Sequence, residues 1–120
     1  MSKIIIPCNY QITDLRFSAN GKYLASSAVN DYSVRVWNAT TGRIHKMLIG
    51  HRNSVRCVAF SPDSINLASG SDDTTINVWD IERNKCVKTL NALRGMGHGS
   101  VLRLAYSPDV STILGIDFRR

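Results

Sequence analysis

The 120-residue sequence lacks several features that would point to a membrane, secreted or metal-binding protein. No apolar run approaches the ~20 residues that a membrane-spanning helix needs. The run Ile4–Ile6 stops at Pro7, which makes it too short for the hydrophobic region of a signal peptide. The cysteines, Cys8, Cys57 and Cys86, are odd in number and too far apart for a CxxC zinc pattern. We therefore expect an intracellular protein, cytoplasmic or nuclear, with no membrane association, no bound metal and no cofactor.

What the chain does contain is typical of a folded globular protein, with 43% hydrophobic and 20% charged residues. Fifteen Lys and Arg against nine Asp and Glu give a net charge of +6. That excess is compatible with an acidic partner such as nucleic acid. The basic residues are spread along the chain, however, and no aromatic residues are interleaved with them as a base-stacking platform requires. Nucleic acid is thus the weaker of the possible partners.

The sequence repeats itself with an offset of 42 or 43 residues. Residues 12–18 align with 55–61, and residues 31–38 align with 73–80. A third copy begins at residues 101–109, after which the pattern is lost. No window has the periodicity of an amphipathic helix, and each unit divides into four short apolar segments separated by turn-forming residues. The repeat therefore predicts an all-β array.

In the second unit the four segments predict strands at residues 55–60, 66–70, 75–79 and 85–90. The third of these alternates with a period of two, as expected for a strand with two different faces. Turn clusters rich in Ser, Asp, Asn and Pro separate the segments. The first unit repeats this plan, so the two units are expected to form the same four-stranded sheet.

These units resemble WD repeats, which build β-propellers from blades of four strands with a period of about 40–45 residues. The second unit carries the motifs Gly50-His51, Leu67-Ala68-Ser69-Gly70 and Val78-Trp79-Asp80. The first unit keeps Val36-Trp37 but has no preceding Gly-His pair. The third unit opens with Gly97-His98 and then stops. The resemblance covers nearly the whole chain.

The resemblance implies an all-β fold of four-stranded antiparallel blades in an incomplete ring. Repeat 1 would span about 11–49, repeat 2 about 50–96 and a truncated repeat 3 about 97–120. Because propellers close with about four to eight blades, these units cannot make a ring. We expect a fragment of a larger propeller, a subunit contributing to one, or a chain that self-associates to complete a ring.

The function implied is that of a non-catalytic scaffold or adaptor that binds a protein or peptide. Two alternatives stay open. One is a nucleic-acid-associated protein that uses the basic rim of its blades, and the other is a truncated gene product without independent function.

In this family a His, a Ser or Thr, an Asp and a Trp commonly form a buried hydrogen-bonded tetrad within a blade. The matching residues are His51, Ser69, Asp73 and Trp79 in the second unit and Ser26, Asp31 and Trp37 in the first, which has no histidine. Ser, His and Asp are also the residue types of a nucleophilic triad, but that requires an exposed nucleophile and an oxyanion hole. We predict a structural role and no catalytic residue. Whether His98 joins a tetrad in the third unit is left open.

The resemblance also places partner contacts at one end of the blades, on the rim of the central channel. Three positions per blade are implied: Ser54, Arg56 and Asp72 in the second unit, Gln11, Thr13 and Asn30 in the first, and Ser100 and Leu102 in the third. Arg56 is the strongest candidate for contact with a peptide or an acidic group. The alternative is that these positions are solvated turn residues.

Overall fold

The computed structural model describes residues 3, 5–6, 8–91, 99–109 and 112–119, which form three antiparallel sheets and contain no helix. The first sheet, blade 1, contains β1 (Ile12–Phe17), β2 (Tyr23–Ala28), β3 (Ser33–Asn38) and β4 (Ile44–Ile49). The second, blade 2, contains β5 (Val55–Phe60), β6 (Asn66–Ser71), β7 (Thr75–Asp80) and β8 (Lys85–Asn91). The third is a hairpin of β9 (Gly99–Tyr106) and β10 (Ile113–Arg119). The predicted fold class, four-stranded antiparallel blades that do not close into a ring, is confirmed.

The same serine-centred turn joins the first two strands of all three sheets. The amides of Ser18, Ser61 and Ser107 each donate to the carbonyl five residues later, at 2.8–2.9 Å. Each of these serine hydroxyls also donates to the carboxylate or amide oxygen of the residue two positions further on. Gly21 and Ser64 occupy equivalent positions in the first two turns with φ values of 73° and 63°. The left-handed backbone at this position is therefore part of the repeat, and glycine satisfies it at the lower conformational cost.

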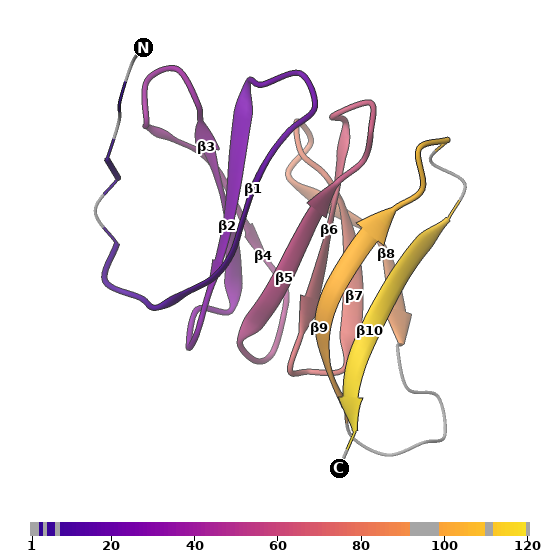
Figure 1. The fold of residues 1–120 in the computed structure, drawn as a ribbon. Helices are drawn as coiled ribbons and strands as arrows, with labels where there is room; N and C mark the ends of the chain where they lie inside the picture. The colour runs from indigo at the N-terminus through magenta and orange to yellow at the C-terminus, as the bar shows by residue number, and fades with distance from the viewer. Residues whose placement is uncertain (1–2, 4, 7, 92–98, 110–111, 120) are drawn as a thin grey trace.

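The three sheets stack face against face, with blade 2 in the middle (Figure 1). Aliphatic side chains of blade 1 pack against apolar side chains of blade 2, and all of the following are at most 2% exposed: Ala25, Val34, Val36 and Leu48 from blade 1, and Val58, Leu67 and Trp79 from blade 2. The opposite face of blade 2 packs on the hairpin through Cys57, Ala68, Ile76 and Val101. Apolar burial between neighbouring sheets is thus what holds the array together.

Hydrogen bonds at the inner strands also connect blade 1 to blade 2. The hydroxyl of Thr13 donates to the carbonyl of Val55 at 2.8 Å, and the amide of Val55 donates to the carbonyl of Asp31 at 3.2 Å. A carboxylate oxygen of Asp14 accepts from the amide of Val58 at 3.1 Å. Directional contacts of this kind fix how one sheet sits on the next, which apolar packing alone does not.

Among the described residues there is no helix that could span a membrane. Within the same part of the chain, His, Cys, Asp and Glu side chains form no group of three or more that could hold a metal ion.

Candidate functional site: the buried tetrad and the polar rim

The four residues of the second predicted tetrad lie together in one chain of hydrogen bonds. The indole N–H of Trp79 donates to Ser69 Oγ at 2.8 Å, and Ser69 Oγ lies 2.6 Å from His51 Nε2. His51 Nδ1 lies 2.8 Å from a carboxylate oxygen of Asp73. The Asp73 carboxylate can only accept a hydrogen bond, so His51 Nδ1 carries the proton and donates to it. Nε2 is then unprotonated and accepts a hydrogen bond from the Ser69 hydroxyl. The direction of every bond in the chain follows from the indole at one end and the carboxylate at the other.

The pKa of Asp73 depends on burial and on hydrogen bonds around the turn between β6 and β7. Burial, the largest single effect, would raise the pKa of Asp73. Hydrogen bonds from the side chain of Thr75, the amide of Arg52 and His51 outweigh it, so the pKa lies below its ordinary value. The carboxylate therefore stays ionised near neutral pH and holds the imidazole in one orientation.

The geometry of Ser69, His51 and Asp73 matches the hydrogen-bond order of a nucleophilic triad, but the surroundings do not. Ser69 is 0% exposed and His51 is 6% exposed. The hydroxyl oxygen that would attack a substrate instead accepts the indole N–H of Trp79. A nucleophile needs an open approach to its oxygen and donors for the developing oxyanion. This arrangement suits a structural role.

Blade 1 keeps only part of the network. Trp37 Nε1 donates to Ser26 Oγ at 3.0 Å, as Trp79 does to Ser69 in blade 2. Asp31 does not join this pair. Its carboxylate accepts from the amide and hydroxyl of Ser33 and from Nε of Arg35, at 2.7–3.1 Å. In the absence of a histidine, the aspartate is satisfied locally by its own turn and by an arginine.

The polar residues predicted for partner binding form a connected network at one end of the two blades. The hydroxyl of Ser54 accepts from the amide of Asn30 at 2.8 Å, and the carbonyl of Ser54 accepts from the amide of Asp72 at 3.0 Å. Ser54 is itself only 3% exposed. Thr13 is likewise engaged, since its hydroxyl donates to the carbonyl of Val55. Ser54 and Thr13 therefore tie blade 1 to blade 2, and their contact with a partner stays a prediction.

Arg56 is paired within the chain. Its guanidinium makes three hydrogen bonds to the two carboxylate oxygens of Asp72, at 2.6–3.0 Å. These bonds raise the pKa of Arg56, against the opposing effect of burial. Both side chains keep some exposure, 34% for Arg56 and 17% for Asp72. A partner carboxylate would have to compete with Asp72, so the rim offers an oriented ion pair in place of an isolated positive charge.

The other predicted positions differ in how far the structure describes them. Gln11 and Asn30 have exposed side chains at the same end of blade 1. Ser100 and Leu102 have their backbones in β9, and their side chains lie outside the described residues. Gly97 and His98 also lie outside the described residues. The expected rim site is thus represented by the residues of the first two units.

Contacts between the blades also use residues that the sequence did not single out. Glu82 accepts from the hydroxyl of Tyr23 at 2.6 Å and lies 3.1 Å from His45 Nε2, while the rings of Tyr23 and His45 stack at 4.9 Å. The Tyr23 hydrogen bond, with a smaller contribution from His45, lowers the pKa of Glu82. In the sequence, the only indication of this contact was that Glu82 is acidic while the outer edge of the blades is otherwise basic.

The sequence matches the model of the WD domain, G-beta repeat family over residues 3–38 and 42–80. Together with the stacked four-stranded sheets, this match shows that the chain belongs to the WD-repeat family, as its motifs predicted. The second matched segment runs from just before β4 to the end of β7, so one sequence repeat extends over two blades. The repeat boundaries we inferred from the sequence stay a prediction.

Two curated relatives illustrate the similarity. One is periodic tryptophan protein 2 of Saccharomyces cerevisiae, with 31% identity over 88% of this chain and 12% of the relative. The other is eukaryotic translation initiation factor 3 subunit I of Aspergillus fumigatus, with 29% identity over 91% of this chain and 30% of the relative. The chain therefore spans less than a third of the length of either protein.

Solved structures show the same fold. The β-propeller domain of Cps50 (Swd1) from Myceliophteria thermophila has a TM-score of 0.80 and 20% identity, covering 93% of this chain and 34% of that one. U3-55K has a TM-score of 0.81 and 24% identity, covering 94% and 35%. At this level of identity the likeness concerns the fold, and here it identifies the sheets as propeller blades.

Proposed function

We propose that the chain is a non-catalytic protein-interaction module, a scaffold or adaptor whose blades contribute to a larger propeller or to a multiprotein assembly. The observation that carries this proposal is the burial of Ser69 and His51 beside Trp79, which commits the Ser-His-Asp group of the chain to a structural network. The name of one relative, a subunit of a translation initiation factor, supports membership in an assembly. An intracellular location is part of the same proposal.

The surface we assign to a protein partner is the rim formed by Gln11, Asn30, Arg56 and Asp72. Its backbone is held by Ser54, which is bonded to both blades, so the exposed groups lie on a rigid base. The Arg56–Asp72 pair presents both a donor fork and carboxylate oxygens, which suits the polar side chains or main chain of a peptide. Rigid presentation lowers the entropy cost of binding.

A photo-crosslinking amino acid placed at Asn30, in cells that express the protein, tests this assignment. We expect crosslinks to a small set of proteins, and we expect Arg56→Ala to reduce their yield severalfold. The same amino acid at Ile65, which is 56% exposed at the opposite end of blade 2, is the matched control. Equal crosslinking from both positions, or insensitivity to Arg56→Ala, would contradict the rim assignment. Crosslinks to nucleic acid alone, or no crosslinks from Asn30, would also contradict a protein partner at this rim.

A further inference from the structure

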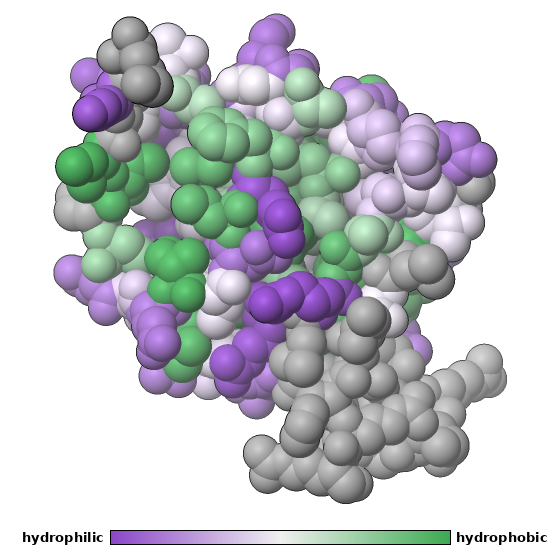
Figure 2. Space-filling view, viewed as in Figure 1, coloured by the Kyte–Doolittle hydropathy of each residue, from purple (hydrophilic) through white to green (hydrophobic). Residues whose placement is uncertain are grey.

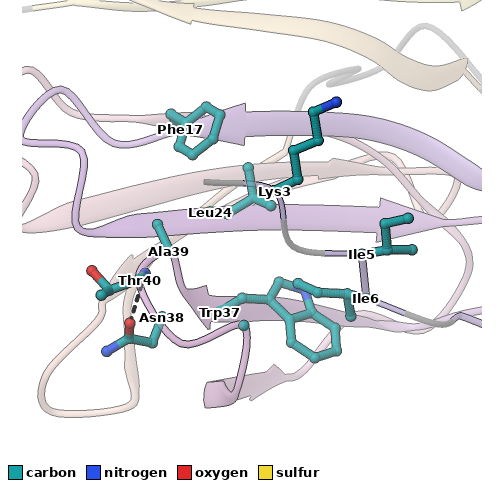
Figure 3. A pocket seen from close by; sticks show the side chains of 10 residues that line it. Lys3, Ile5, Ile6, Phe17, Leu24, Trp37, Asn38, Ala39 and Thr40 are labelled. Carbon is teal, nitrogen blue, oxygen red and sulfur yellow. Dashed lines mark hydrogen bonds between the residues drawn. The ribbon is translucent and has the colours of Figure 1, made fainter. Parts of the chain in front are cut away.

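One cavity of the structure, of about 690 Å³, is lined mainly by apolar side chains and lies between Ile6 and the residues Phe17, Leu24 and Trp37 (Figure 3). Figure 2 shows apolar side chains gathered on this side, where the N-terminal segment passes β1 and β2. Leu24 and Trp37 correspond in the repeat to residues of blade 2 that pack on blade 1. The apolar lining of this cavity is therefore explained as a surface for contact between blades.

A second cavity, of about 480 Å³, is polar and lies where blade 2 meets the segment that leads from blade 1. We call it the Asn77 cavity and define it by Gly50, Arg52, Asp73, Asn77 and Thr89. The first two residues belong to the link between β4 and β5, the third to the turn between β6 and β7, and the last two to β7 and β8. The cavity is thus enclosed by elements of blades 1 and 2 and of the link between them.

The first unit of the repeat has a longer side chain at the position of Asn77. In the register of the two sheets this position is occupied by Arg35. Arg35 reaches back to the carboxylate of Asp31, with Nε at 2.9 Å, and its guanidinium lies 5.4 Å from the centre of the Tyr10 ring. Asn77 is too short for such a contact, and His51 already binds the aspartate of blade 2. The exchange of arginine for asparagine therefore accounts for the open space.

The outer strands also differ between the two units. Cys86 and Thr89 line the cavity from β8, at the register positions that Ile44 and Met47 occupy in β4. Because the fold accommodates apolar side chains at these positions, it does not require polar ones there. The polarity of the Asn77 cavity is therefore a property of this site, and it needs an explanation other than the architecture of the blade.

Asn77 supplies a hydrogen-bond donor to the cavity. The residue is only 5% exposed, and its Oδ1 accepts from Thr89 Oγ1 at 2.9 Å, which fixes the orientation of the carboxamide. Among the residues that the structure describes, none accepts a hydrogen bond from Asn77 Nδ2. A Cβ on Gly50 would lie 3.8 Å from Nδ2, so glycine keeps this nitrogen accessible. A nearly buried N–H group without an acceptor favours a ligand that provides one.

The charges beside the cavity favour an uncharged ligand. Arg52 contributes one positive charge and Asp73 one negative charge. Both carboxylate oxygens of Asp73 already accept, from the amide of Arg52, from His51 and from the amide and hydroxyl of Thr75. The carboxylate is therefore saturated for a cationic ligand, and it would repel an anionic one. A carboxamide oxygen accepts hydrogen bonds without adding a charge.

We propose that the Asn77 cavity binds the side-chain carboxamide of a glutamine or asparagine in an extended segment of the protein partner. Its oxygen would accept from Asn77 Nδ2 and from the guanidinium of Arg52, and hydroxyl oxygens of Thr74 and Thr75 in the same lining can accept from its N–H groups. The volume exceeds that of one side chain, so adjoining main chain enters with it. This inference rests on the proposed interaction function, to which it adds one anchoring contact.

NMR titration of the full chain with capped tripeptides tests the site. The probe has glutamine between two alanines, and two matched peptides carry glutamate or leucine in its place. We expect the glutamine peptide to shift the side-chain amide of Asn77 and the backbone amide of Thr89 in a saturable way, with a millimolar dissociation constant. The glutamate peptide should bind severalfold more weakly, and the leucine peptide should cause no shift.

Two variants reduce the cavity with side chains that blade 1 already carries. Asn77→Arg copies Arg35, and Thr89→Met copies Met47. Each should raise the dissociation constant of the glutamine peptide by at least about tenfold, because the volume and the oriented donor are lost. Ile65→Met, at an exposed position at the opposite end of blade 2, is the matched control and should leave the constant unchanged. Circular dichroism verifies that each variant folds.

The exposed position of Thr89 keeps the test informative even where Asn77→Arg disturbs the buried tetrad. Equal binding of the three peptides, absence of a shift at Asn77, or unchanged binding by Thr89→Met would overturn the proposal. The rim assignment is measured separately, by the crosslinks from Asn30. Intact crosslinks without peptide binding would contradict the cavity site alone, and peptide binding without crosslinks would contradict the rim alone.

Discussion

Ser69 is the residue at which the two halves of the tetrad meet, since its hydroxyl oxygen accepts from Trp79 and lies against His51. Removing the indole N–H would leave that buried oxygen short of one donor. We therefore predict that Trp79→Phe lowers the free energy of unfolding by about 1–3 kcal/mol. Urea denaturation followed by circular dichroism measures the change.

Trp37 provides the control for this prediction. It makes the same bond to Ser26, at 3.0 Å, but no histidine continues the hydrogen-bond chain in blade 1. Because no histidine in blade 1 depends on the Ser26 hydroxyl, Trp37→Phe should cost less free energy of unfolding than Trp79→Phe, although Ser26 is itself only 5% exposed. Equal losses at the two positions would show that ring size, and not the buried bond, determines the effect.

At the scale of the elements, the close contact between β6 and β9 depends on glycine at position 70, which has no side chain. A Cβ on Gly70 would lie 2.5 Å from Val101 Cγ1 and 2.7 Å from Cys57 Sγ, so the hairpin packs directly on the backbone of β6. We predict that Gly70→Ala destabilises the protein by about 1–3 kcal/mol through overpacking. Thermal unfolding followed by circular dichroism measures it.

The matched substitution is Gly115→Ala, in β10 of the same interface. A Cβ there would meet Leu104 and Ile76 at 3.2 and 3.3 Å, distances that small side-chain shifts can relieve. A loss at Gly115 as large as that at Gly70 would mean that the hairpin tolerates no added volume anywhere, and not that the Gly70 contact is specific.

The strands were predictable from the sequence where the repeat is strong. Residues 55–60 form β5 as predicted, and β6 extends one residue further, because Ser71 pairs with Val55. β10 was not foreseen, since residues 113–119 lack the Leu-Ala-Ser motif. It forms because Tyr106 pairs with Ile113 as Phe60 pairs with Leu67, so the turn and the register persist where the motif does not.

The candidate site was predictable only within a blade. The grouping of His51, Ser69, Asp73 and Trp79 was implied by the resemblance of the second unit to a WD repeat, because these residues match the motif of that family. The engagement of Ser54 and Thr13 between blades could not be predicted, because it depends on how one sheet sits on the next. Spacing along a strand specifies which face a side chain occupies, but it does not specify the partner from another sheet.

For the whole molecule, the middle sheet is the one that is covered on both faces. Nearly every residue of β6 and β7 is buried, whereas β1 is largely exposed or half-buried. We predict that native-state hydrogen exchange is slowest in β6 and β7 and faster in β1, because stability in a stacked array depends on neighbours. Mass spectrometry of the exchanging chain measures this gradient. Uniform exchange rates across all three sheets would instead indicate that the array opens as a single cooperative unit.

The frame of the sequence repeat has a consequence for how such an array can grow. The segment matched at residues 42–80 begins before the outermost strand of one sheet and ends with the third strand of the next. A duplicated coding segment of this length would not encode a separate sheet. It would encode the last strand of one sheet and the first three strands of the next. The fourth strand of that next sheet would come from the following segment. Each added copy would thus share a sheet with the copy before it and a sheet with the copy after it. The array could then lengthen with the same contact between neighbouring blades.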